Sequence, residues 1–260
     1  MFDDFTLIAG PCSLEEKELN LKIANRLAKI SEQFGIQIVF KGSFDKANRS
    51  RLTSPRGPGL RHGLELLSEV KRETELRVLT DIHEPNQAEE VSIVADVLQI
   101  PAFLARQTDL LVAAGKTGRP VNIKKAQWMS SEELKGAYEK VRESRNSEVI
   151  VTERGTFFGY GDLVVDMRNF RRLKNELHCP VFFDGTHSVQ RPGRSSGSTG
   201  GDPIYTTDLV LAAVGAGCEG IFLEVHPDPR SAPSDGSTML PLHELQKLLE
   251  KVMKLREILQ

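Results

Sequence analysis

The sequence has few of the features that mark secreted, nucleic-acid-binding or membrane proteins. Only three cysteines occur among 260 residues, at positions 12, 179 and 218, which is neither a disulfide framework nor a zinc-finger spacing and indicates a reducing compartment. The formal net charge of -2 argues against a general nucleic-acid or membrane-surface partner. The first residues, MFDDFTLIAG, lack the basic and apolar regions of a signal peptide. We therefore expect a cytoplasmic protein.

Long apolar runs are also missing. The longest one, residues 209–225, is interrupted by Gly215, Gly217, Glu219 and Gly220, which divide it into a helix, a turn and a strand. No GxGxxG motif follows the first apolar run, and no change in composition marks a second domain. We expect one catalytic domain over residues 1–260, and we disfavour an open, doubly wound sheet.

Short β-branched or aromatic runs recur along the chain, and segments with helical spacing separate them. Leu19, Ile23, Leu27 and Ile30 form one helical stripe, and residues 242–259 form the last predicted helix. Continuous apolar runs are typical of parallel strands buried on both faces, so the alternation predicts an α/β protein with the (β/α)8 TIM-barrel fold. The eight runs are FTLIAG, IQIVFKGS, LRVLTDI, ADVLQIPA, PVNIKKA, EVIVTERG, PVFFDGT and EGIFLEV.

Polar residues interrupt these runs almost entirely at their C-terminal ends, which face one mouth of a barrel. Buried charges without partners cost several kcal/mol, so the cations there require carboxylate partners or anionic ligands. We expect more than one anionic group to bind, on the side opposite strands seven, eight and one. The strand-end residues are Lys41, Asp81, His83, Gln99, Lys124, Lys125, Glu153, Arg154, Asp184 and Glu224, and the basic set is Lys41, Lys46, Arg49, Arg106, Lys124 and Arg154.

Four residues that are far apart in the chain are candidate metal ligands: Cys12, His187, Glu224 and Asp235. A closed barrel places its first strand beside its eighth, which would bring them together. Thiolate, imidazole and carboxylate ligands suit Zn²⁺ or Fe²⁺ better than Mg²⁺ or Ca²⁺. Taken singly, Cys12 could be a buried core residue and Asp235 a turn residue.

The segment QRPGRSSGSTGGD, residues 190–202, is rich in Gly and Ser and follows the seventh run. Its composition predicts a mobile loop. A surface insertion without a role is the alternative, but loops at the C-terminal face of a barrel commonly serve in binding and closure.

The motifs together resemble one family, 3-deoxy-D-manno-octulosonate 8-phosphate (KDO8P) synthase. The resemblance runs from AGPC through KGSFDKANRS, TDIHE, QIPAFLARQTDLL, NIKKAQ, TERG, DGTHSVQ and LEVHPDP to SDGSTMLPL. It implies a transferase that condenses phosphoenolpyruvate with arabinose 5-phosphate and water in the biosynthesis of Kdo, a lipopolysaccharide core sugar. Ala126 and Trp128 depart from the family pattern, where Gly and Phe are common.

The resemblance also implies roles for individual residues. Lys124 and Arg154 would hold the phosphate of phosphoenolpyruvate, with Lys41, Ser43, Lys46 and Gln99 near its carboxylate. Asn48, Arg49 and Ser50 would bind arabinose 5-phosphate, with Asp81 near its hydroxyls and Arg106 reaching its phosphate from a neighbouring subunit of a homotetramer. The catalytic set would be Cys12, Lys46, Lys124 and His187.

Cys12 stands where metal-independent members of this family have Asn, so the resemblance implies a divalent metal. Its ligands would be Cys12, His187, Glu224 and Asp235, and Mn²⁺ joins Zn²⁺ and Fe²⁺ as a candidate ion.

Three alternatives stay open. A related synthase acts on erythrose 4-phosphate, although KANRS argues against it because that family usually has a KPRTS-like segment there. A non-catalytic sugar-phosphate sensor and a Schiff-base aldolase using Lys124 or Lys125 are the others.

Overall fold

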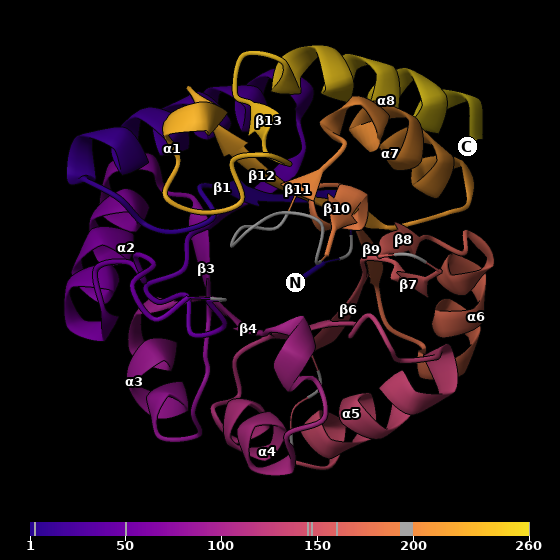
Figure 1. Ribbon diagram of the computed structural model, residues 1–260, viewed down its shortest axis with the longest axis horizontal. Helices are drawn as coiled ribbons and strands as arrows, with labels where there is room; N and C mark the ends of the chain where they lie inside the picture. Colours follow the sequence, from indigo (N-terminus) through magenta and orange to yellow (C-terminus); the bar gives the residue numbers. More distant parts are fainter. Residues whose placement is uncertain are drawn as a thin grey trace.

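Eight parallel strands close into a barrel in the computed structural model, which describes residues 1–2, 4–49, 51–144, 146, 148–159, 161–192 and 200–259. β12 pairs with both β9 and β1, so the sheet has no open edge between its ends (Figure 1). The TIM-barrel prediction is therefore confirmed. The barrel strands are β1 Thr6–Gly10, β2 Gln37–Lys41, β3 Arg77–Asp81, β4 Val97–Ile100, β5 Val121–Lys124, β6 Val149–Glu153, β9 Val181–Asp184 and β12 Gly220–His226.

Helices surround the barrel and cover its outer face (Figure 1). The predicted stripe is buried in α1, where Ile23, Leu27 and Ile30 are inaccessible to solvent, and α1 ends at Gly35 in the left-handed conformation, with φ of 60°. The helices are α1 Lys17–Phe34, α2 Leu60–Thr74, α3 Gln87–Val94, α4 Thr108–Lys116, α5 Ser131–Glu143, α6 Arg168–Leu177, α7 Thr206–Gly215 and α8 Leu245–Leu259. No helix within the described residues is long and apolar enough to cross a bilayer.

The last helix begins three residues later than predicted. Leu240–Pro241 forms the short strand β13, which pairs in parallel with the end of β12, and the Leu242 amide donates to His226 O at 2.9 Å. These tertiary contacts hold the chain extended where its apolar spacing continues the helical pattern. Helix α8 therefore starts at Leu245.

Short elements decorate the C-terminal face. They are the hairpin β7 Thr156–Phe158 with β8 Asp162–Val164, the pair β10 Gln190–Arg191 with β11 Gly200–Gly201, and the 3-10 helices η1 Ala102–Leu104, η2 His187–Val189, η3 Pro203–Tyr205 and η4 Pro229–Ser231. The loop predicted over residues 190–202 is thus paired at its two ends. Residues 193–199 lie outside the described residues, so its predicted mobility stays a prediction.

The barrel interior is filled by apolar side chains below the mouth, where Phe2 packs edge-on against Phe182 with ring centroids 5.7 Å apart. Side chains alternate between the two faces of a strand, so the residue two positions after an interior one also points inward. Val39 precedes Lys41 in this way, and Phe222 precedes Glu224. The interior apolar residues are Ile8, Val39, Leu79, Val97, Ile150, Phe182 and Phe222.

The seam between the first and last barrel strands fixes the position of several polar residues. In its register Gly10 lies opposite Glu224, and β1 also pairs with β2. A Cβ atom at Gly10 would lie 2.0 Å from Lys41 O, so only glycine permits this close approach of the two backbones. Cys12 and Lys41 are thereby brought beside Glu224.

Candidate functional site

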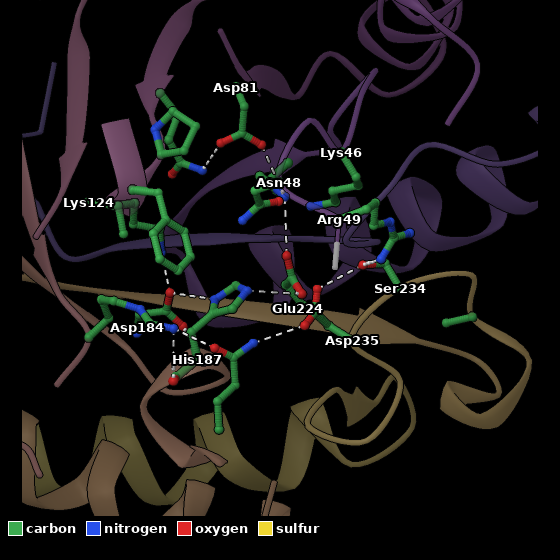
Figure 2. Close-up of a pocket in the computed structure, with 18 of the residues that line it drawn as sticks. Lys46, Asn48, Arg49, Asp81, Lys124, Asp184, His187, Glu224, Ser234 and Asp235 are labelled. Atoms are coloured by element: carbon green, nitrogen blue, oxygen red, sulfur yellow. Dashed lines mark hydrogen bonds and ion pairs between the residues drawn. The ribbon is translucent and has the colours of Figure 1, made fainter. Parts of the chain in front are cut away.

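A cavity of about 540 Å³ occupies the C-terminal mouth of the barrel, as the strand-end pattern predicted. Cys12 and Ser43 are fully buried and contact residues of its wall. Figure 2 draws lining side chains that converge from the barrel strands and the loops that follow them, and labels ten of them. The predicted residues that line the cavity are Lys41, Lys46, Asn48, Arg49, Asp81, His83, Gln99, Lys124, Arg154, Asp184, His187, Glu224 and Asp235.

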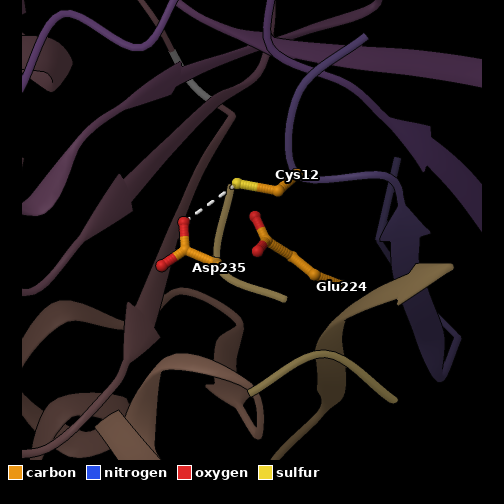
Figure 3. A group of neighbouring side chains, drawn as sticks. All are labelled: Cys12, Glu224 and Asp235. Carbon is orange, nitrogen blue, oxygen red and sulfur yellow. Dashed lines mark hydrogen bonds between the residues drawn. The ribbon is translucent and has the colours of Figure 1, made fainter. Parts of the chain in front are cut away.

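Three of the four predicted metal ligands form one cluster (Figure 3). Donor atoms of Cys12, Glu224 and Asp235 all lie within 4.8 Å of one another, and Cys12 Sγ donates to Asp235 Oδ2 at 3.1 Å. Glu224 Oε2 is buried without a hydrogen-bond partner among the described residues. A buried carboxylate oxygen without a donor, beside a thiol and a second carboxylate, fits a divalent cation.

His187 lies at the edge of this cluster. Its Nε2 is 3.5 Å from Glu224 Oε2, while its Nδ1 contacts Asp184 Oδ2 at 2.7 Å. Asp184 Oδ1 also accepts from the backbone N–H of His187 at 2.8 Å. A carboxylate on one ring nitrogen fixes the tautomer and leaves the other nitrogen to face a metal, as in many histidine ligands.

The surroundings of Cys12 favour the neutral thiol over the thiolate. Burial raises its pKa well above the usual value, the charges of Glu224 and Asp235 raise it further, and Lys46 and Lys41 oppose them. Because thiolate is the form that binds metal, uptake of a cation there releases a proton.

Lys41 lies beside the metal-ligand candidates, which corrects the expectation that the cations sit on the opposite side. Its Nζ donates to Cys12 O at 2.9 Å and to Glu224 Oε1 at 3.2 Å, and it lies 3.6 Å from Asp81 Oδ2. The interior of an eight-stranded barrel is only wide enough for side chains to meet across it. A cation on β2 therefore reaches a carboxylate on β12.

The surroundings of Lys46 stabilise its charged form. Burial alone would lower its pKa, but the carboxylates of Glu224, Asp81 and Asp235 outweigh that effect and raise it. Its Nζ donates to Ser43 Oγ at 3.1 Å. Lys46 thus provides a fixed positive charge at the edge of the acidic cluster.

A buried hydrogen-bonded chain crosses the strands and reaches the cavity wall at Gln99 and Asp81. Thr152 donates to Asn122 at 2.7 Å, Asn122 to Gln99 at 2.8 Å, and Gln99 to Asp81 Oδ1 at 2.6 Å, while Ser43 donates to Asp81 Oδ2. Burial favours a neutral Asp81, but the lysines and His83 outweigh it and lower the Asp81 pKa. Each amide in this chain therefore has one orientation, which fixes the cavity wall.

Lys124 and Arg154 form the cationic side of the cavity. Lys124 contacts Asp184 and lies 3.2 Å from the centroid of the Phe222 ring, and burial lowers its pKa to about 8 although Asp184 opposes that shift. Arg154 Nη2 donates to Gln190 Oε1 at 2.5 Å and to His187 O at 3.2 Å. Its Nη1 is buried without a partner among the described residues, so it is a donor available to an anion.

Lys125 and Glu153 do not face the mouth, which corrects that prediction. They form their own fully buried ion pair at 3.3 Å, and neither lines the cavity. Each lies one residue away from an inward-facing position of its strand, so its side chain points to the outer face of the barrel.

Arg106 does not line the cavity. Its side chain is 68% exposed and lies 3.8 Å from Glu133, which corrects the inference that all six cations converge. Arg49 lines the cavity and is held by Ser234 Oγ at 2.7 Å and Pro233 O at 2.9 Å. Ser50 lies outside the described residues.

Several lining residues were not predicted. Gln127 and Ser234 lie in loops, and Gln190 begins β10, so the strand-end rule does not find them. Gln190 and Ser234 lay inside quoted motifs, but their residue types alone carry no chemical signal. Asp235 has both of its expected roles, because its backbone, with φ of 51°, turns the chain while its side chain enters the cluster.

Comparison with known proteins places the chain in a family. Residues 3–260 match the model of the DAHP synthetase I family. Proteins named 2-dehydro-3-deoxyphosphooctonate aldolase are similar along almost their whole length: that of Syntrophobacter fumaroxidans is 49% identical over 98% of this chain and 88% of its own, and that of Brucella ovis is 50% identical over 95% and 89%. The protein of that name from Fusobacterium nucleatum is 46% identical over 98% and 92%. The predicted resemblance is thereby confirmed, and the chain belongs to the DAHP synthetase I family.

Proposed function

We propose that this protein is a KDO8P synthase, a transferase that joins phosphoenolpyruvate to D-arabinose 5-phosphate with water and releases inorganic phosphate. The observation that carries the proposal is one cavity with buried cations, Lys124 and Arg154, next to a Cys, Glu and Asp cluster. The relatives that share the chain's whole length are named for the eight-carbon product. The reaction belongs to the biosynthesis of Kdo.

The residues of the cavity suit the two anionic reactants. Lys124 and the unpartnered Nη1 of Arg154 would hold the phosphate of phosphoenolpyruvate, while Lys41, Ser43 and Lys46, with Gln99 nearby, would face its carboxylate. The aldose would lie towards Asn48, Arg49, Ser50 and Asp81. Holding both reactants across one barrel mouth supplies catalysis through orientation.

In the reaction, C3 of phosphoenolpyruvate forms a bond to the aldehyde carbon, whose oxygen takes up a proton. Water adds its oxygen to C2, and phosphate leaves with the electron pair of its bond to C2 as that oxygen becomes the C2 carbonyl. The water gives up both of its protons, which balance the one taken up by the aldehyde oxygen and the one taken up by the departing phosphate. Negative charge grows on the departing phosphate, so Lys124 and Arg154 bind it more strongly as the bond breaks.

A divalent ion, Zn²⁺, Fe²⁺ or Mn²⁺, would be held by Cys12, His187, Glu224 and Asp235. When bound, it supplies Lewis acidity that polarises an oxygen of the sugar or of water. Support comes from the 4.8 Å cluster and from the orientation of His187 by Asp184.

The proposal includes one catalytic domain over residues 1–260 and a homotetramer in which Arg106 completes a neighbouring site. The exposure of Arg106, away from its own cavity, supports this assignment. Sedimentation velocity tests the tetramer. Arg106→Ala should raise the KM for arabinose 5-phosphate more than that for phosphoenolpyruvate.

The decisive experiment compares aldoses with the purified protein, Mn²⁺ and phosphoenolpyruvate. We expect phosphate release and an octulosonate phosphate with arabinose 5-phosphate, and at most slow release with erythrose 4-phosphate. A preference for the four-carbon aldose would refute the substrate assignment, and binding without release would indicate a sensor. A borohydride-stable adduct on Lys124 would indicate a Schiff-base mechanism.

The metal assignment is tested separately. A chelator should abolish turnover, and Cys12→Ala should lose both stoichiometric metal and activity. Cys179→Ala is the matched control, because Cys179 is buried at the opposite end of the barrel, two residues before the start of β9. Full activity of Cys12→Ala in chelator would refute a catalytic metal at this cluster.

A further inference from the structure

Gln190 joins the phosphate side of the cavity to the metal cluster. Its Oε1 accepts from Arg154 Nη2 at 2.5 Å, and its Nε2 donates to Asp235 Oδ1 at 2.9 Å. The side chain is nearly inaccessible, with 9% of its surface exposed, and it lines the cavity between these two partners. One amide therefore spans two subsites that bind different ligands in the proposed function.

Both partners fix the orientation of this amide. A guanidinium only donates hydrogen bonds and an ionised carboxylate only accepts them, so the carbonyl oxygen must face Arg154 and the NH₂ must face Asp235. The backbone holds the same position, because Gln190 pairs with Gly201 in the β10–β11 ladder and Asp202 N donates to Val189 O at 3.0 Å.

The two carboxylate oxygens of Asp235 have different donors. Oδ2 accepts from Cys12 Sγ and from Ser234 Oγ at 2.8 Å, whereas Gln190 bonds to Oδ1. A cation that replaces the thiol proton between Cys12 and Asp235 leaves the bond from Gln190 in place. The bridge is therefore compatible with an occupied metal cluster.

We infer that Gln190 is a positioning residue that couples metal binding at the Cys12, Glu224 and Asp235 cluster to phosphate binding by Arg154. The inference rests on the proposed function. A bound cation restricts the motion of the Asp235 carboxylate, and the Gln190 amide, hydrogen-bonded to it, restricts the Arg154 guanidinium in turn. The phosphate then binds an arginine that is already oriented. By linkage, bound phosphoenolpyruvate raises the affinity for the metal by the same factor.

The test measures this factor at equilibrium, without turnover. The Kd of Mn²⁺ is determined from free Mn²⁺ by electron paramagnetic resonance, with and without saturating phosphoenolpyruvate and in the absence of any aldose. We expect the wild-type Kd to fall about fivefold or more when phosphoenolpyruvate is bound, the lower end of typical coupling. Gln190→Met keeps the length of the side chain but loses the hydrogen bonds to Arg154 and Asp235. In this variant the ratio of the Mn²⁺ Kd without phosphoenolpyruvate to the Kd with it should fall to within about twofold of one.

A second variant and a control separate coupling from general damage. Gln190→Asn keeps the amide but is one methylene too short to span both partners, so it should also lose the coupling. Gln246→Met removes an amide that accepts from Arg26 on the outer face, at 2.7 Å, and should keep the wild-type ratio. If the role of Gln190 were purely structural, its variants would bind Mn²⁺ more weakly both with and without phosphoenolpyruvate. The ratio of the two Kd values would then stay at the wild-type value.

The outcomes distinguish the two proposals. A wild-type protein that binds no phosphoenolpyruvate, or makes no octulosonate phosphate, would refute the proposed function. An active wild type whose ratio is near one, or Gln190 variants that keep the full ratio, would refute only the coupling.

Discussion

The buried pair of Lys125 and Glu153 provides a sharp test of the energetics of this barrel. Both side chains are fully inaccessible, and Glu153 Oε1 also accepts the backbone N–H groups of Arg154 at 2.9 Å and Gly155 at 2.7 Å. Lys125 Nζ donates to Thr156 Oγ1 at 3.1 Å as well as to carbonyl oxygens. The pair thus holds together the chain segments that follow β5 and β6, directly beside the cationic side of the cavity.

Removing one partner leaves the other charge buried. Such a loss costs about 3–5 kcal/mol, and we expect the lower end, about 3 kcal/mol, for Lys125→Met and for Glu153→Gln. The lower end applies because each remaining group keeps several hydrogen bonds. The double variant removes both charges, so it should lose about 2 kcal/mol less than the sum of the single variants.

The free energy of unfolding is measured by urea denaturation at one fixed protomer concentration, because association adds to apparent stability. Lys135→Met is the matched control, since Lys135 pairs with Glu176 at 4.0 Å with 47% of its side chain exposed, and it should cost less than about 1 kcal/mol. Additive losses in the double variant, or single losses as small as the control's, would refute the reasoning.

Three further predictions concern charge. Because burial lowers the pKa of Lys124 to about 8, the ammonium is lost as the pH rises through that value. We therefore expect kcat/KM for phosphoenolpyruvate to fall about tenfold by one pH unit above this pKa. A pH profile that does not fall there contradicts the assignment of Lys124 to phosphate binding. Arg168 lowers the pKa of Asp166 to about 2, so its carboxylate stabilises the fold above pH 4 and that contribution is lost as the pH falls towards 2. Asp166→Asn should therefore cost about 1 kcal/mol at pH 7, and urea midpoints of variant and wild type should converge on acidification. Asp184→Asn should weaken Mn²⁺ binding by about 10–100-fold, because His187 loses the carboxylate that orients it; unchanged affinity in a Mn²⁺ titration would separate His187 from the metal.

The fold was largely predictable because the apolar patterns that cause it lie within short stretches of the sequence. Strands buried on both faces need continuous apolar runs, and covering helices need one apolar stripe, as in Ile23, Leu27 and Ile30. The start of the last helix was not predictable, since the pairing of β13 with β12 decides it. Such pairing depends on residues that are distant in sequence.

The candidate site was predictable where a residue type and a strand end coincide. The rule succeeded for Lys124 and Arg154 but failed for their neighbours Lys125 and Glu153. Adjacent residues of a strand point to opposite faces, and two consecutive lysines do not reveal which one points inward. Gln190 gave no signal either, because an amide becomes informative only when its two partners are known.

The seam between β1 and β12 has a consequence for how the protein is made. Cys12 is synthesised before β2 and every later barrel strand, whereas Asp235 follows only after β12, with β13 and α8 still to come. A nascent chain therefore has the thiol long before it has the carboxylates that complete the cluster. Retention of a cation there would mark a chain that extends past Asp235, and a fragment that ends before β12 would carry Cys12 without Glu224 and Asp235.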